Sequence, residues 1–395
     1  MNNDTDVLII GGGLAGAALA LLLRRQQRLR VKLVEAVALP PANETPFTPS
    51  FDARSTALSA GTLDIFSRIG IDEALLPYAA DIRVVHVSRR GRPGIAHIRA
   101  DEENLPRLGA VVENRWLGRV LLNKVRADEG IEVIAPDHPV SVQRQVSGYR
   151  VTLESGRVLE CALLVAADGA RSLTRERLGI GAEHHDTRHD ALIANIALAQ
   201  PHEGMAFERF VDDGPMAMLP MPDQRSALVW TGPRETINKL KQCAPEEFLA
   251  RVQEQFGDRL GVLQSVGERD TYPLILTRSF AQAIPHAVVV GNAAHTLHPV
   301  AGQGFNLTLR DLYLLAEILA EAENPGELSV LQRYAEAREA DQALISRASR
   351  WLPDLFRVQT GLVSHARQLG LIAFDLLPGV RSRFAGKAMG FANGL

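Results

Sequence analysis

The sequence predicts an α/β fold of the α+β type, in which a mostly parallel sheet with covering helices is interrupted by an antiparallel sheet and followed by C-terminal helices. Three patterns support this prediction. A strand, a glycine turn, a helix and a second strand open the chain, several short strand candidates occupy residues 191–233, and the chain after Leu328 has a helical pattern. A length of 395 residues is compatible with two or three domains at roughly 150 residues each.

The first part of the chain predicts one βαβ unit. Val7–Ile10 is a continuous apolar run, as expected of a strand that is buried on both faces of a parallel sheet. Gly11–Gly13 ends that strand, Ala15–Gln27 is rich in small and aliphatic residues and predicts a helix, and Val31–Glu35 predicts the second strand. Two strands joined by one helix in this way are parallel.

The rest of the chain alternates between the two sheet types. Residues 36–60 form a long connection rich in Pro, Thr and Ser, and loops of that length tend to be functional. Residues 140–167 predict short strands with turns between them, and residues 285–291 predict another buried parallel strand before a helix that begins near Asn306. The antiparallel strand candidates are residues 191–199, 206–211, 216–219 and 226–230.

These patterns predict a discontinuous arrangement of domains. The mostly parallel domain takes residues 1–80, 106–180 and 275–335, the antiparallel domain takes residues 81–105 and 181–274, and residues 336–395 form a C-terminal helical region. We interpret the histidines that open the antiparallel domain as part of a polar loop; they are His184, His185 and His189.

Composition and charge exclude several classes of protein. Hydrophobic residues make up 46% and charged residues 23%, so the chain is not disordered as a whole. A net charge of -3 gives no electrostatic reason to expect nucleic acid as a partner. Cys161 and Cys243 lie far apart and form no dithiol or zinc motif. The acidic amino terminus and the short apolar run Ala15–Leu23 favour a cytoplasmic protein without a membrane span.

The strongest local motif is Gly11-x-Gly13-x-x-Gly16 between the first strand and the first helix. Glycines at this spacing allow a tight turn, a close approach of pyrophosphate and close packing of the helix on the strand. Glu35 follows Gly16 by 19 residues, at the end of the second strand, where a carboxylate binds the hydroxyls of an adenosine ribose. The motif predicts a dinucleotide site for FAD or NAD rather than NADP.

The chain contains no second strand–GxGxxG–helix pattern. Two alternatives therefore remain from this motif alone. Either NAD is the only nucleotide, or FAD is bound here and a nicotinamide nucleotide reacts with it without a domain of its own.

Two further motifs, in a fixed order, distinguish these alternatives. Asp168-Gly169 follows a buried strand, and Gly291-Asn292-Ala293-Ala294-His295 follows another, with Pro299 and Gly302–Asn306 next. Together with the first motif they resemble the class A flavoprotein monooxygenases, the para-hydroxybenzoate hydroxylase family, over most of the chain. Phe51–Arg54, Glu208–Phe210 and Tyr272–Leu274 are similar to the ubiquinone-biosynthesis hydroxylase branch of that family.

The resemblance implies a set of cofactor-binding residues. Asn292 departs from the family, which usually has Asp there, and an amide oxygen accepts a weaker hydrogen bond than a carboxylate. Arg54 and Arg119 could instead be surface arginines, and Asp168-Gly169 could be a plain turn. The residues that the resemblance assigns to FAD are Gly11, Gly13, Gly16, Glu35, Arg54, Arg119, Asp168, Gly169, Gly291, Asn292, Pro299, Gly302, Gln303, Gly304 and Asn306.

Substrate and catalytic residues are less well marked. The antiparallel sheet is expected to supply the apolar side of a substrate cleft, with plain core as the alternative; the candidates are Met216, Met218, Leu219, Pro220 and Trp230. His298 is a candidate proton relay, and no other catalytic side chain is assigned. His295 and His298 are three residues apart but have no third ligand, so no metal is expected.

The resemblance implies an FAD-dependent enzyme that uses NADPH or NADH and O2 and forms a flavin C4a-hydroperoxide. Its terminal oxygen would attack the ring of a polyprenylated phenol, 2-polyprenyl-6-methoxyphenol at the para position. The alternatives are hydroxylation at another ring carbon, a flavin oxidase or reductase of a different small molecule, and a non-catalytic flavoprotein subunit.

The C-terminal segment from Gln342 to Leu395 is locally basic, and an apolar prenyl tail needs a carrier or a surface. This segment is a candidate contact for the inner face of a membrane or for other ubiquinone-biosynthesis proteins, with a solvated helical face as the alternative. Its charged residues are Arg347, Arg350, Arg357, Arg367, Arg381, Arg383 and Lys387 against Asp354 and Asp375.

Overall fold

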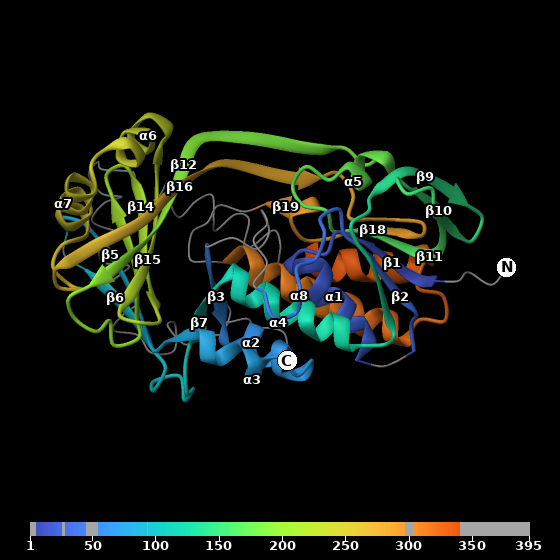
Figure 1. Cartoon of the computed structure of the whole chain (residues 1–395), viewed down its shortest axis with the longest axis horizontal. Helices are drawn as coiled ribbons and strands as arrows, with labels where there is room; N and C mark the ends of the chain where they lie inside the picture. Colours follow the sequence, from blue (N-terminus) through green and yellow to red (C-terminus); the bar gives the residue numbers. More distant parts are fainter. Residues whose placement is uncertain (1–4, 26–27, 45–53, 93, 297–302, 340–395) are drawn as a thin grey trace.

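The computed structural model describes residues 5–25, 28–44, 54–92, 94–296 and 303–339 (Figure 1). Two large sheets lie at opposite ends of this structure, and two long strands, β12 (Ala182–Leu198) and β16 (Leu263–Ser279), run from one end to the other. This arrangement confirms the predicted combination of a mostly parallel sheet with an antiparallel one.

The parallel sheet is built on the predicted βαβ unit. Its strands stand in the order β17–β18–β11–β1–β2–β8, and β18, β11, β1, β2 and β8 run parallel. The carboxyl ends of parallel strands share one edge, so the loops after β1, β11 and β18 meet there. The bounds are β1 (Thr5–Ile10), α1 (Leu14–Arg24), β2 (Val31–Val34), β8 (Ile131–Ile134), β11 (Val158–Ala166), β17 (Ala283–Ile284) and β18 (Ala287–Val289).

Both faces of this sheet are covered, which explains why its strands are apolar throughout. On β1, Val7 and Ile9 pack against helices α1, α4 (Asn114–Ala127) and α8 (Gln303–Glu321). Leu8 and Ile10 face the opposite way and pack against the hairpin of β9 (Pro139–Gln145) and β10 (Gly148–Leu153). The hairpin continues into β11 as an antiparallel pair.

The antiparallel sheet has the order β19–β16–β12–β15–β14–β13–β5–β6, and every neighbouring pair is antiparallel except β13 with β5. Helices α6 (Arg234–Gln242) and α7 (Pro245–Phe256) cover its outer face (Figure 1). The remaining bounds are β5 (Val84–Arg89), β6 (Ile95–Arg99), β13 (Met205–Val211), β14 (Gly214–Met221), β15 (Arg225–Pro233) and β19 (His295–Thr296).

The interpretation of His184, His185 and His189 as a polar loop is wrong, because all three lie in β12. The first part of β12 pairs with β16 along one edge, while its side chains stay largely exposed. An exposed two-stranded ribbon has no buried face. Its sequence therefore lacks the apolar alternation from which a strand is predicted.

A small antiparallel sheet in the order β3–β7–β4 lies against the antiparallel domain. The long connection of residues 36–60 contributes β3 to it, a strand that the sequence pattern did not predict. The bounds are β3 (Ser55–Ser59), α2 (Ala60–Arg68), α3 (Asp72–Leu75), the 3-10 turn η1 (Leu76–Tyr78), β4 (Ala79–Ile82) and β7 (Gly109–Glu113).

Two short elements follow strands of the parallel sheet, α5 (Leu173–Arg177) and the 3-10 turn η2 (Gly291–Ala293). Residues 328–339 are helical, and the rest of the predicted C-terminal helical region lies outside the described residues. The strands of the antiparallel sheet come from residues 84–99, 182–279 and 295–296. We propose the domain division given above on this basis.

Candidate flavin site

The glycine-rich turn is shaped so that only glycine fits at two positions. Gly11 has a φ of 106°, and a β-carbon there would lie 2.6 Å from the carbonyl oxygen of Ala167 at the end of β11. A β-carbon on Gly16 would lie 1.8 Å from the carbonyl oxygen of Gly11. The turn is therefore pressed against both its own helix and the neighbouring strand.

The carboxylate of Glu35 lies beside the same turn. One oxygen accepts a hydrogen bond of 2.6 Å from the backbone N–H of Gly12, and the other accepts one of 3.0 Å from the N–H of Val37. Each carboxylate oxygen has a second lone pair, so both can still accept from a ribose hydroxyl. The structure thus places the Glu35 carboxylate beside the glycine turn, and its role in holding a ribose stays a prediction.

Helix α1 begins directly after the turn, and its first N–H groups have no competing anion. Its N-cap residue, Gly13, supplies no side-chain hydrogen bond, and the first turn contains no acidic residue. The amino end of a helix carries a partial positive charge, which makes it a natural site for a pyrophosphate. These features fit the ADP half of FAD.

The carboxylate of Asp168 is engaged within its own turn. It accepts hydrogen bonds from the Ser172 hydroxyl and, at 3.0 Å, from the Thr174 N–H. Gly169 has a φ of 87° and open space around its α-carbon. Asp168 therefore orders the turn, and the backbone at Gly169 is the part that is accessible to a ligand.

The third motif packs against the first and is hydrogen-bonded to the segment after the second. Gly291 has a φ of 59°, and a β-carbon on it would lie 3.1 Å from the side chain of Ala15 at the start of α1. The fully buried Arg175, which follows the Asp168 turn, donates from Nη1 to the Ala293 carbonyl over 2.9 Å. Asn292 is exposed between buried neighbours, as a cofactor ligand should be. The three predicted motifs thus converge at one edge of the parallel sheet.

The side chain of Asn306 is engaged within the protein. It donates to the Ala57 carbonyl over 2.8 Å and accepts from the Ser59 N–H over 2.9 Å and from the Thr62 hydroxyl over 2.7 Å. The residue is almost fully buried, so its amide ties the first turn of α8 to β3 and α2. Gly304, two residues earlier in the same turn, has open space around it.

Of the two predicted arginines, Arg54 is the one that faces the antiparallel sheet. Its guanidinium carbon lies 4.6 Å from the ring centroid of Tyr272 on β16. Arg119 lies on α4 with its guanidinium carbon 5.7 Å from the ring of Trp116 on the same helix. His298, Pro299 and Gly302 lie outside the described residues, and so does the side chain of Gln303.

The five predicted substrate residues do not share one face of the sheet. Met216, Met218 and Trp230 are buried among the apolar side chains of α6 and α7, on the outer face of the sheet. Leu219 lies on the opposite face, against the small sheet, and Pro220 is buried beside Ser226. The first three are therefore core residues, because the face that they occupy is closed by helices.

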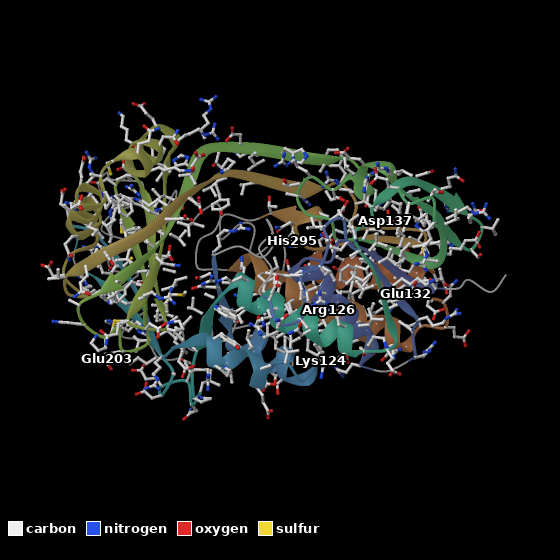
Figure 2. The ribbon with its side chains drawn as sticks, in the orientation of Figure 1. Lys124, Arg126, Glu132, Asp137, Glu203 and His295 are labelled. Atoms are coloured by element: carbon white, nitrogen blue, oxygen red, sulfur yellow. The ribbon has the colours of Figure 1, made fainter. Side chains whose placement is uncertain are left out.

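His295 follows the η2 turn and lies in β19, the edge strand of the antiparallel sheet, near the middle of the molecule (Figure 2). Its pKa is lowered to about 4, because burial disfavours the charged imidazolium and nearby Arg338 repels it. Sequence reasoning included His295 in the third motif and rejected it as a metal ligand, and it missed Arg338 and its ion-pair partner Asp311. The signal that could have drawn attention to Asp311 is a charged residue inside the apolar pattern of α8.

The lowered pKa of His295 predicts a loss of stability in acid. Between pH 6.5 and about 4 the unfolded chain binds a proton at His295 that the folded chain does not bind. Stability therefore falls by about 3 kcal/mol as the pH drops through this window, and this group causes no further change below it. Urea unfolding at a series of pH values tests this expectation. The free energy of unfolding should decline less with falling pH in His295→Gln than in the parent. An equal decline in the two proteins would contradict the expectation.

Replacing Asn292 by Asp is expected to raise the affinity for FAD. In Asn292→Asp a charged acceptor replaces a neutral one, and charge-assisted hydrogen bonds are about twice as strong. A gain of about 1 kcal/mol corresponds to FAD binding that is roughly five-fold tighter. The ratio of flavin to protein absorbance after dilution measures the effect. We expect the parent to lose flavin and the variant to keep it; equal retention would show that residue 292 does not contact the cofactor.

The fold and these contacts define a protein that binds FAD in a cradle of the dinucleotide-binding α/β type. Among the residues that the structure describes, no group of three or more His, Cys, Asp or Glu side chains is placed to hold a metal ion. The FAD binding domain family matches residues 4–348. The chain belongs to this family and is an FAD-dependent monooxygenase.

Two relatives match almost the whole chain. Ubiquinone hydroxylase UbiL of Rhodospirillum rubrum is 33% identical over 98% of this chain and 89% of its own length. The 3-demethoxyubiquinol 3-hydroxylase of Escherichia coli is 29% identical over 95% of each chain.

Solved structures share the fold at lower identity. PqsL of Pseudomonas aeruginosa has a TM-score of 0.78 and 23% identity over 93% of this chain and 99% of that one. p-Nitrophenol 4-monooxygenase PnpA of Pseudomonas putida has a TM-score of 0.77 and 17% identity over 99% of both chains.

Proposed function

We propose that this FAD-dependent monooxygenase uses NAD(P)H and O2 to hydroxylate the aromatic ring of a polyprenylated phenol in ubiquinone biosynthesis. The observation that carries the proposal is the convergence of three flavin motifs at one sheet edge, in a chain that aligns over nearly its full length with ubiquinone hydroxylases. Bound FAD supplies the redox chemistry, and the chain supplies binding, orientation and electrostatics.

The proposed substrate is 2-polyprenyl-6-methoxyphenol, hydroxylated para to its hydroxyl group, as the motifs suggest. A second candidate is hydroxylation at another ring carbon. The name of the Escherichia coli relative, a 3-demethoxyubiquinol 3-hydroxylase, favours this second candidate. Both candidates need the same flavin chemistry and differ only in how the ring is held.

We propose that the FAD-binding residues divide by task. Glu35 would hold the ribose, the N–H groups at the start of α1 would hold the pyrophosphate, and Asn292 would accept from the ribityl chain. Asp168, Arg175 and Asn306 would act indirectly, because their side chains are engaged with the protein. Arg119, Gln303 and the segment with Pro299 and Gly302 stay predictions.

The substrate cleft would be lined by the inner face of the antiparallel sheet. On this face Tyr272, Ala191 and Thr231 stand side by side on β16, β12 and β15. Two residues further along the strands, the same face carries the row of Ile193, Val229 and Ala217. Most of these side chains are small or apolar, as the wall of a pocket for an aromatic ring would require. This face replaces Met216, Met218 and Trp230 as the proposed pocket wall.

Arg54 and Tyr272 would form one end of this cleft. Arg54 precedes β3, and its backbone carbonyl accepts a hydrogen bond of 2.8 Å from the N–H of Asn114 at the start of α4. Its guanidinium then extends to the ring of Tyr272. A cation that is held against an aromatic ring beside an apolar floor is suited to the phenol oxygen of a substrate.

Truncating Tyr272 is expected to weaken substrate binding. In Tyr272→Ala the ring contact and the support of Arg54 are lost, so the KM for a prenylated phenol should rise about ten-fold, equivalent to about 1.4 kcal/mol. FAD content should not change. Phe280→Ala, which removes an aromatic ring that is 75% exposed, is the matched control. An unchanged KM for Tyr272→Ala would remove the residue from the substrate site.

The reaction itself is tested with purified FAD-loaded protein, NADPH, isotopically labelled O2 and a short-chain 2-prenyl-6-methoxyphenol. We expect one labelled oxygen atom in the ring, and its position distinguishes the two candidates. Formation of peroxide in a one-to-one ratio with oxidised phenol, without ring labelling, would identify an oxidase instead. Deletion of the gene should lead to accumulation of the precursor that lacks the same oxygen.

We also propose that the basic C-terminal segment brings the enzyme to its apolar substrate, at an anionic membrane face or on another protein of the pathway. Residues 340–395 lie outside the described residues. In the part that is described, no helix has both the length and the apolar character needed to cross a bilayer. Co-sedimentation of full-length and shortened protein with anionic liposomes tests the membrane contact, and equal partitioning would contradict it.

A further inference from the structure

A group of buried polar side chains lies where α8, β19 and the helix of residues 328–339 meet. Each of these side chains is less than 9% exposed; they are His295, Arg310, Asp311, Tyr334 and Arg338. Burying charges is unfavourable unless they are paired well, so such a group is expected only where it serves a specific arrangement. None of these side chains is among those that we assign to FAD or to the substrate.

Asp311 is at the centre of the group. One carboxylate oxygen, Oδ1, accepts a hydrogen bond of 2.5 Å from Nε of Arg338. The other, Oδ2, lies 3.6 Å from Nε2 of His295. That distance is longer than a hydrogen bond, so Arg338 is the ion-pair partner and the neutral imidazole lies beside the carboxylate.

These three residues come from three segments: β19 after the η2 turn, α8, and the helix of residues 328–339. His295 follows the η2 turn, and its backbone pairs with Arg278 on β16. Asp311 lies on α8, whose first turn Asn306 ties to β3. Arg338 lies on the helix of residues 328–339 and contacts Asp311. The ion pair therefore joins α8 to the helix of residues 328–339, and the η2 turn meets this pair through the buried imidazole of His295.

We propose that Asp311, Arg338 and His295 are positioning residues that form a clamp, and that this clamp sets the geometry of the two segments against which FAD binds. The proposal rests on FAD binding, which the family membership shows, and not on the identity of the substrate. Buried elements of this kind have discrete arrangements rather than a continuous range. Loss of the clamp should therefore shift the flavin environment and not only the stability of the fold.

Two variants and one control test the clamp. Arg338→Met removes the cation. Arg338→Lys keeps the charge but lacks the planar guanidinium, and it replaces Arg338→Met as the test variant if that protein does not fold. Arg333→Met is the matched control on the same helix, because the ion pair of Arg333 with Glu321 is exposed and spans 3.7 Å. The readouts are the Kd for FAD from fluorescence quenching and the visible circular dichroism of the bound flavin.

We expect the Kd for FAD to rise at least about ten-fold in Arg338→Met and less in Arg338→Lys, with an altered visible dichroism spectrum in both. Arg333→Met should match the parent. The double variant Asp311→Asn with Arg338→Met removes both members of the ion pair and should regain thermal stability, but not FAD affinity.

Two results would overturn the proposal. The first is parent-like FAD affinity in Arg338→Met. The second is recovery of affinity together with stability in the double variant, which would reduce the group to a structural role. Activity toward phenols does not enter this test, so its failure is separate from a failure of the proposed function.

Discussion

Gly16→Ala is expected to yield a folded protein that no longer retains FAD. The added β-carbon would lie 1.8 Å from the carbonyl oxygen of Gly11, which is backbone and cannot rotate away. The glycine turn must then move off α1, and the N–H groups that face the pyrophosphate move with it. Overpacking of this kind costs about 1–3 kcal/mol, so the Kd for FAD should rise about ten-fold or more.

Gly267→Ala is the matched control for this substitution. The nearest atom to a β-carbon at Gly267 is 3.6 Å away, an ordinary van der Waals contact, and the residue lies on β16, far along the chain from the turn. Flavin absorbance after gel filtration measures both variants. Retention of FAD by Gly16→Ala at the level of Gly267→Ala would show that the turn does not hold the cofactor.

Glu35→Gln is expected to give the second large effect. The substitution removes the charge that accepts from the Gly12 and Val37 N–H groups and, in the complex, from the ribose. Hydrogen bonds to a charged group contribute about 1.5–3 kcal/mol, so the Kd for FAD should rise about ten-fold to a hundred-fold. Titration of the apoprotein with FAD, followed by fluorescence, provides the measurement.

The control for this prediction is Glu132→Gln on β8, the strand next to β2. Glu132 forms exposed ion pairs with Lys32 and Arg157, and Figure 2 shows it at the side of the parallel sheet. Surface pairs of this kind contribute little, so Glu132→Gln should leave FAD affinity unchanged. Equal affinities for the two glutamine variants would contradict the role of Glu35.

The parallel sheet and the glycine turn could be predicted from sequence because local physics determines them. A strand that is buried on both faces must be apolar at every position, as Val7–Ile10 is, and the contacts at Gly11 and Gly16 admit no side chain. The number of residues from Gly16 to Glu35 is the length needed for one helix and the strand that follows it. The same reasoning placed the third motif after β18.

The face of the antiparallel sheet that we propose for the substrate could not be predicted in this way. Alternation along β14 separates Met216 and Met218 from Ala217 and Leu219, but it does not say which set faces the flavin. That choice depends on α6 and α7, which cover one face from a later part of the chain. For the same reason the pairing of Asp311 with Arg338, 27 residues apart, is visible only in the folded structure.

The polar residues of the second motif show a related limit. Sequence order marked Asp168 as important, but not whether its carboxylate binds a ligand or the turn. In the structure the Asp168 carboxylate accepts hydrogen bonds from Ser172 and Thr174. The ordered turn places the buried Arg175, which donates to the Ala293 carbonyl. The motif thus joins two loops of the flavin site, a task that depends on contacts between distant segments.

A crystal structure of the full chain grown with FAD tests the central claim most directly. We predict that the ribose hydroxyls lie within hydrogen-bond distance of Glu35, that the pyrophosphate meets the first N–H groups of α1, and that the flavin ring points toward the inner face with Tyr272. Electron density for the adenine half away from Glu35, or for the ring on the side of Met216 and Trp230, would contradict the account.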